Sequence, residues 1–194
     1  MSTLSQSIRT MAFEGVAEDR RLLFGVGAVA FALATAAGAQ VAVPLPWTPV
    51  PVTLQPLFVI LAGVVLGPRL GAISMAAYVT MGAMGAPVFS NGAAGLPWLF
   101  GPTGGYLLAA PAAALIAGVV AGREGPAWRL ALGLAAGVVV MYVGGVAQLM
   151  ALTGQGLGAT LSLGVVPFLV GDVTKIAVAF FAVSAARWSR RPGA

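Results

Sequence analysis

The chain has 194 residues, of which 59% are hydrophobic and only 8% are charged, and its mean hydropathy is +0.98. Soluble domains carry about 25% charged residues, so this composition excludes an ordinary soluble surface and predicts a membrane protein. The net charge of +5 comes from basic residues scattered between apolar stretches, which do not form a nucleic-acid-binding face. The chain has no cysteine and no histidine, which excludes disulfides, Cys/His metal sites and Cys–His or Ser–His–Asp catalysis.

The first 21 residues are polar and mixed in charge, unlike a cleaved signal peptide. We interpret residues 1–21 as an amphipathic lead-in in the cytoplasm or on the membrane surface. Residues 22–187 then form one transmembrane domain, and residues 188–194 form a basic cytoplasmic tail.

The remaining chain predicts a compact all-α bundle of six transmembrane helices, because about 20 apolar residues span a bilayer and buried helices can be shorter. Their expected limits are Leu22–Val41, Gln55–Leu66, Arg69–Met84, Gly104–Ala121, Trp128–Leu152 and Val165–Ala186.

The charges test this helix count independently. Six helices put nine of the ten basic residues on one side of the membrane, and the opposite loops, 42–54, 85–103 and 153–164, contain no charged residue. By the positive-inside rule, both termini lie in the cytoplasm. The uncharged loops are rich in proline and glycine, and we expect them to fold over the outer end of the bundle.

The first helix is crowded with small residues at four-residue spacing, which lets another helix approach closely. This face either packs inside the bundle or docks a partner protein. Its members are Ala28, Ala30, Ala32, Ala34 and Ala36.

Asp172 and Lys175 are two ionisable residues inside the sixth helix. A charge within a span is costly and usually faces a cavity, and the i, i+3 spacing puts both side chains on one face. With a helix from Val165, Asp172 would lie about 10 Å from the helix start. A purely structural salt bridge is the alternative, but we favour a functional site.

Other polar and aromatic side chains are expected in the same outer half, and together they predict a pocket that opens outward. The polar members are Gln55, Asn91, Tyr106 and Tyr142. One cation, one anion, amides and aromatic walls suit a small zwitterion or a heterocycle that bears a carboxylate. No GxxxxGK[ST] motif occurs, so ATP-driven uptake would need a partner subunit.

Three blocks of the sequence resemble the BioY family, the biotin-specific S components of energy-coupling factor (ECF) transporters. They are PVPVTLQPLFVILAGVVLGPRLGAISMAAY, GAPVFSNGAAGLPWLFGPTGGYL and GVVPFLVGDVTK. The resemblance implies high-affinity biotin binding and uptake across the bacterial cytoplasmic (inner) membrane. It also implies no enzymatic activity, no cofactor and no metal, with a coupling protein and ATPase subunits as partners.

The resemblance further implies that Asn91, Asp172 and Lys175 contact biotin and that Gln55 and Tyr106 lie at the edge of the pocket. Asp172 would accept from a ureido N–H, whereas Lys175 would donate either to the ureido carbonyl or to the tail carboxylate. Phe89, Trp98 and Tyr106 are candidates for packing on the apolar bicycle. The resemblance also favours partner docking for the small-residue face of the first helix.

Three alternatives remain open on the sequence. The first is an S component for thiamin or riboflavin, although a pocket with Lys175 beside Asp172 offers cationic thiamin little net attraction. The second is a solitary proton- or ion-coupled carrier. The third is an intramembrane enzyme, which lacks a second acid–base partner in the membrane.

Overall fold

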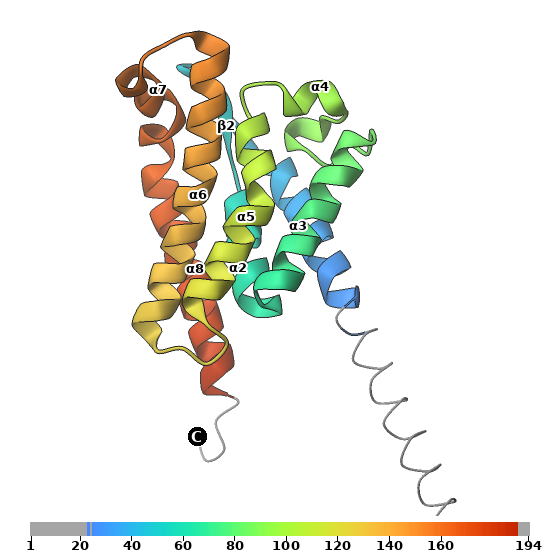
Figure 1. Cartoon of the computed structure of the whole chain (residues 1–194), viewed down its shortest axis with the longest axis vertical. Helices are drawn as coiled ribbons and strands as arrows, with labels where there is room; N and C mark the ends of the chain where they lie inside the picture. The colour runs from blue at the N-terminus through green and yellow to red at the C-terminus, as the bar shows by residue number, and fades with distance from the viewer. Residues whose placement is uncertain (1–22, 24, 190–194) are drawn as a thin grey trace, which may run out of the picture.

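The computed structural model describes residue 23 and residues 25–189, and helices dominate this part of the chain (Figure 1). Six long helices occupy the positions predicted for the spans. They are Gly25–Gln40, α2 (Gln55–Leu66), α3 (Pro68–Ala83), α5 (Gly104–Ala121), α6 (Ala127–Thr153) and α8 (Leu169–Trp188). The predictions for residues 1–22 and for residues 190–194 of the basic tail lie outside the described residues.

The segments predicted as outer loops contain secondary structure of their own. These elements are β1 (Ala42–Leu45), β2 (Thr48–Thr53), the 3-10 turn η1 (Ser90–Gly92), α4 (Leu96–Leu99) and α7 (Leu157–Gly164). The predicted helical bundle is therefore confirmed, and one short antiparallel hairpin, which was not predicted, is added to it. Proline is tolerated in edge strands, and both strands of this two-stranded sheet are edges; the pairing is irregular around Pro44.

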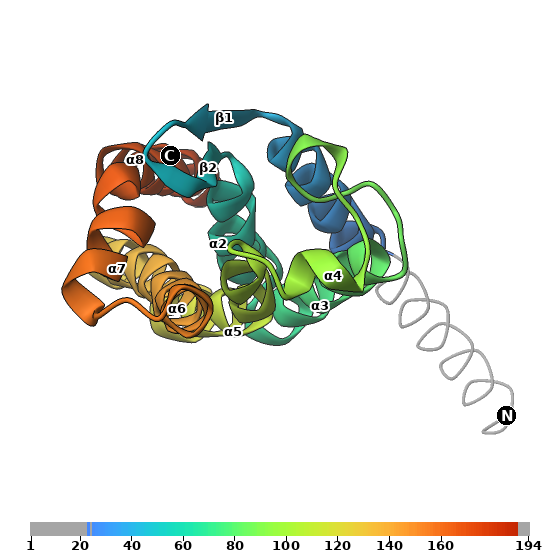
Figure 2. The same ribbon diagram turned by 90° about the horizontal axis from the view of Figure 1, so that it is seen from above.

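The hairpin folds over the end of the bundle, as expected for the first outer loop (Figure 2). The Thr48 hydroxyl donates to the carbonyl oxygen of Leu163 at 2.8 Å, which ties β2 to the end of α7. The hairpin, α4 and α7 thus lie together at one end of the molecule (Figure 1).

The predicted start of the sixth helix is wrong by four residues. The chain forms a 3-10 turn, η2 (Val166–Phe168), and α8 begins only at Leu169. Pro167 explains the difference, because a proline disfavours the α conformation in the residue before it but fits the first turn of a helix. Asp172 consequently lies in the first turn of α8 and not about two turns inside the helix.

Close backbone contacts hold α5 against its neighbours. A Cβ on Gly63 of α2 would overlap the carbonyl of Ala114 in α5, and a Cβ on Gly118 would meet Gly63 and Pro68. Such small residues allow helices in a membrane to approach closely. The result is a rigid α2–α3–α5–α6 core against which the remaining elements are positioned.

Apolar side chains cover the outside of this bundle. Among the described residues, three stretches are long and apolar enough to cross a membrane: α5, α6 and residues Leu157–Trp188, which combine α7, η2 and α8. Val139, Val143 and Phe181 are each more than half exposed. Apolar surface on this scale requires lipid as its solvent, so the protein is a multi-pass membrane protein.

The four arginines in the described part of the chain, Arg69, Arg123, Arg129 and Arg187, lie at the end opposite the hairpin. The α2–α3 junction, the α5–α6 loop and the last turn of α8 all lie there (Figure 1). Arg187 donates to the carbonyl oxygens of Gly122 at 2.8 Å and Gly125 at 3.0 Å, and Arg129 donates to Val120 at 3.0 Å. This arrangement agrees with the predicted segregation of charge; which compartment this end faces remains a prediction.

Candidate ligand-binding site

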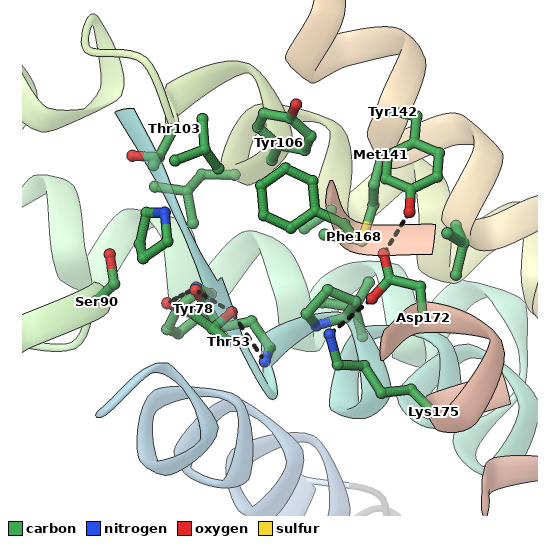
Figure 3. A pocket seen from close by; sticks show the side chains of 18 of the residues that line it. Thr53, Tyr78, Ser90, Thr103, Tyr106, Met141, Tyr142, Phe168, Asp172 and Lys175 are labelled. Atoms are coloured by element: carbon green, nitrogen blue, oxygen red, sulfur yellow. Dashed lines mark hydrogen bonds and ion pairs between the residues drawn. The ribbon is translucent and has the colours of Figure 1, made fainter. Parts of the chain in front are cut away.

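A pocket lies at the end of the bundle that carries the hairpin, between the helices and the segments β2, η1 and α4 (Figure 3). The empty space inside it, including the part open to solvent, is about 720 Å³. Its walls are mostly apolar, from residues such as Val59, Leu107, Val138, Met141 and Phe168. A few polar groups therefore decide what it can bind.

One side of the pocket carries a buried ion pair. Lys175 Nζ donates to Asp172 Oδ1 at 2.6 Å, and the two residues are only 7% and 4% exposed. The hydroxyl of Tyr142 donates to the other carboxylate oxygen, Asp172 Oδ2, at 2.6 Å. Both carboxylate oxygens are thus held by α6 and α8, while the ammonium group has further N–H donors for a ligand.

A neutral hydrogen-bond network lies where α2 begins. The Gln55 amide donates to the Tyr78 hydroxyl at 2.7 Å, and this hydroxyl donates to the carbonyl of Val88 at 3.0 Å. The Thr53 hydroxyl donates to Gln55 Oε1 at 3.0 Å. The network joins β2, α2, α3 and the segment before η1, so it fixes this wall of the pocket before any ligand arrives.

Six of the eight predicted site residues line the pocket. They are Gln55, Trp98, Tyr106, Tyr142, Asp172 and Lys175. They come from α2, α4, α5, α6 and α8, so the fold brings together side chains that are up to 120 positions apart in the chain. The Tyr106 hydroxyl donates to the carbonyl of Gly164 at 2.6 Å, which joins α5 to the end of α7.

Asn91 and Phe89 are not among the lining residues of this structure. Asn91 has φ of 58°, and its side chain is exposed, because the turn at η1 directs Ser90 and not Asn91 to the pocket. Phe89 is fully buried against Tyr78, with ring centroids 5.8 Å apart. Phe89 therefore supports the wall from behind, and a ligand contact for either residue remains a prediction.

Sequence reasoning missed several lining residues, among them Thr53, Tyr78, Ser90, Thr103 and Phe168. Hydroxyl groups are common between transmembrane helices, so single Ser and Thr residues gave no distinctive signal. Tyr78 carried a usable signal, since a buried tyrosine needs a hydrogen-bond partner. Phe168 could not be placed without the 3-10 turn that precedes α8.

The small residues of the first helix divide between two faces. Ala32 is 2% exposed and belongs to the cluster with Tyr78 and Phe89, and the carbonyl of Ala28 accepts from Ser74 at 2.5 Å. Ala28 and Ala36 are half-buried beside it, so this row packs inside the bundle. Ala30 is exposed and Ala34 is half-buried on the other row, which leaves part of the predicted docking face open.

The fold and the pocket define a class of protein: a helical membrane protein with a largely apolar pocket at one end of its bundle. Comparison with known proteins narrows the class, since the BioY family profile matches residues 15–191. The chain belongs to the BioY family.

Individual relatives agree with this assignment. The "Probable biotin transporter BioY" of Pyrococcus horikoshii is 43% identical over 149 residues, which are 77% of this chain and 86% of that protein. The "Biotin transporter BioY" of Thermotoga maritima is 43% identical over 73% of this chain and 82% of its own length. A crystal structure of the S-component for biotin from an ECF-type ABC transporter superimposes with a TM-score of 0.78 at 22% identity, covering 87% of this chain and 93% of that chain. This last likeness establishes the fold.

Proposed function

We propose that this chain binds biotin with high affinity in the pocket beside α8 and acts in biotin uptake as the S component of an ECF-type transporter in the cytoplasmic membrane. The observation that carries the proposal is the buried Asp172–Lys175 pair in the wall of an otherwise apolar pocket. The names of the family's curated relatives, which are biotin transporters, support the choice of ligand.

The chemistry of biotin matches both the apolar walls of the pocket and its buried ion pair. Its fused ring system is apolar and suits the walls formed by Phe168, Met141 and the Tyr106 ring. Its ureido group offers N–H donors and a carbonyl acceptor, which complement a carboxylate and an ammonium group placed side by side. Asp172 would accept from the ureido N–H, and Lys175 would donate to an oxygen of the ligand.

We also propose that a membrane coupling protein and two ATPase subunits energise release, with both termini of this chain in the cytoplasm. The described residues contain no phosphate-binding GxxxxGK[ST] loop of their own. The open part of the first helix offers a docking face, since Val29, Ala30 and Leu33 are exposed on it. A bulky Ala30→Phe substitution is then expected to reduce biotin uptake in cells while leaving biotin binding in detergent unchanged.

Calorimetry on the purified protein in detergent tests the proposed ligand. We expect saturable binding of biotin and no binding of thiamin or riboflavin. Asp172→Asn is expected to lose biotin affinity with normal expression, whereas Glu124→Gln, which removes a carboxylate from the exposed α5–α6 loop, serves as the matched control. The proposal is contradicted if titration with biotin gives no heat of binding, or if Asp172→Asn binds biotin with normal affinity. Uptake that survives ATP depletion and stops with an uncoupler indicates an ion-coupled carrier instead.

A further inference from the structure

The indole nitrogen of Trp98 is unusual among the described residues. Trp98 Nε1 is the one buried side-chain nitrogen or oxygen in the described part of the chain without a hydrogen-bond partner. A buried N–H without a partner costs about 1–3 kcal/mol, and tryptophan normally finds an acceptor for this group when it is buried. Trp98 also lines the pocket, so the missing acceptor can be supplied by a ligand.

The segment that carries Trp98 is held in place from both sides. Gly95 N donates to the carbonyl of Gly82 in α3 at 2.7 Å. On the other side, the Gln148 amide of α6 donates to the carbonyls of Leu99 at 2.8 Å and Gly101 at 2.7 Å. The backbone on either side of the indole is therefore anchored to two long helices, which makes the N–H a preorganised donor.

Two hydroxyl groups from the same stretch of chain as Trp98 also line the pocket. Ser90 and Thr103 flank Trp98 in the sequence and line the same pocket, and their side chains make no hydrogen bond to any other described residue. Figure 3 shows Ser90 and Thr103 on one side of the pocket and Asp172, Lys175 and Tyr142 on the other, with Phe168 between them. The pocket thus has a neutral end with free donors and a charged end, separated by apolar walls.

The two ends suit different parts of one ligand. The charged end offers an acceptor and a donor side by side, which is the complement of a ureido group. The neutral end offers the indole N–H of Trp98 and the O–H groups of Ser90 and Thr103, none of which carries a negative charge. These donors suit a ligand group that can only accept hydrogen bonds. A carboxylate is such a group, and hydrogen bonds to it are roughly twice as strong as those between neutral groups.

Resting on the proposed function, we infer that the Trp98 indole N–H donates to the carboxylate of bound biotin and selects for that carboxylate, while the ureido group occupies the Asp172–Lys175 end. Trp98 is then a specificity-determining residue in addition to an aromatic wall. Lys175 consequently donates to the ureido carbonyl and not to the tail.

Trp98→Phe tests this inference because it removes the N–H and keeps an aromatic side chain. We expect its affinity for biotin to fall by about 10- to 100-fold, the range for a hydrogen bond to a charged group. For biotinol, in which a hydroxymethyl group replaces the carboxylate, the loss is expected to be several times smaller. Trp128→Phe, which alters an exposed tryptophan on α6, is the matched control and is expected to bind both ligands normally.

Nuclear magnetic resonance of the unmutated protein provides a second test that needs no folded Trp98 variant. The chain has four tryptophans, and single Phe variants at the other three positions assign the Trp98 indole signal by elimination. Biotin is expected to move that proton signal downfield, and biotinol to move it less. An unmoved signal, normal biotin binding by Trp98→Phe, or equal losses for biotin and biotinol overturns the inference. Failure of the unmutated protein to bind biotin overturns the proposed function instead.

Discussion

Replacing Lys175 by methionine removes one half of the buried ion pair and keeps most of the side-chain volume. The Nζ–Oδ1 distance is 2.6 Å, and Asp172 is only 4% exposed, so the carboxylate that remains has little access to water. Breaking a buried pair from one side costs about 3–5 kcal/mol. The Tyr142 hydroxyl still donates to Asp172 Oδ2, so we expect a value near the lower limit, about 3 kcal/mol.

Thermal unfolding in detergent measures this cost. For a chain of this size about 2–4 °C of Tm corresponds to 1 kcal/mol, so we expect Lys175→Met to lower Tm by about 6–12 °C. The double variant Asp172→Asn, Lys175→Met is expected to recover most of the loss, because it leaves no unpaired charge. Both variants are expected to lose biotin binding.

Arg69→Met is the matched control for this experiment, since it also removes one positive charge but at an exposed position. Its Tm is expected to stay within about 1–2 °C of the unmutated protein. A normal Tm for Lys175→Met refutes the reasoning, because the carboxylate then does not need its partner. A double variant as unstable as the single one refutes it too, because the loss then comes from packing and not from charge.

Three further outcomes follow from the same structure. Tyr142→Phe leaves one oxygen of the buried carboxylate without its donor, and we expect a loss of about 1.5–3 kcal/mol in stability, measured as a lower Tm with unchanged helix content by circular dichroism. Gly63→Ala forces α2 away from Ala114 of α5 and is expected to lower Tm strongly, whereas Gly25→Ala, with no atom within 4 Å of the added Cβ, is expected to leave Tm unchanged. Because the chain has no cysteine, Glu124→Cys and Gln155→Cys report topology: we expect an impermeant maleimide added to whole cells to label only Gln155→Cys, and the reverse pattern contradicts the predicted orientation.

The helices that could be predicted to the residue are those whose ends carry proline or glycine. The helix Gln55–Leu66 is followed by Gly67, with φ of 89°, and then by Pro68, the first residue of α3. This Gly-Pro pair therefore indicates where one helix ends and the next begins. At α8 the same kind of signal was present in Pro167, but the apolar residues on both sides of it extended the predicted helix to Val165. Hydropathy alone cannot distinguish a 3-10 turn from the first turn of an α-helix.

The hairpin and α7 were not predictable for a different reason. Four prolines between Pro44 and Pro51 argue against strands in general, and the hairpin tolerates them only because neither strand has a second neighbour. At α7, Gly156 precedes the helix and Gly158 and Gly164 lie in it, and these glycines weaken the helical signal. In both cases tertiary contacts at the end of the bundle, such as Thr48 with Leu163, override local preference.

The site was predictable where its residues are rare in a membrane and not where they are common. Asp172 and Lys175 stand out in an apolar span, whereas the hydroxyl of Ser90 does not. The prediction selected Asn91, whereas the neighbouring Ser90 lines the pocket in this structure. The left-handed turn at Asn91 is held by Gln40: Gly92 N–H donates to Gln40 Oε1 at 2.9 Å, and Gln40 donates to the carbonyl of Phe89 at 3.1 Å. No sequence pattern specifies this clamp from the end of the first helix.

The neutral end of the pocket is formed around α4 and its charged end by α8, and a ligand that reaches both ends would connect these two elements. Among the larger contacts, α4 packs against α3 and α5, whereas α8 packs against α2, α6 and η2. A ligand held by Trp98 at one end and by Asp172 at the other adds a link between these groups. Amide hydrogen exchange is therefore expected to slow on biotin binding both at residues 90–103 and at the start of α8, and to stay unchanged in the α5–α6 loop. Protection confined to α8 contradicts a ligand that spans the pocket, because the loop end would then gain no contact from binding.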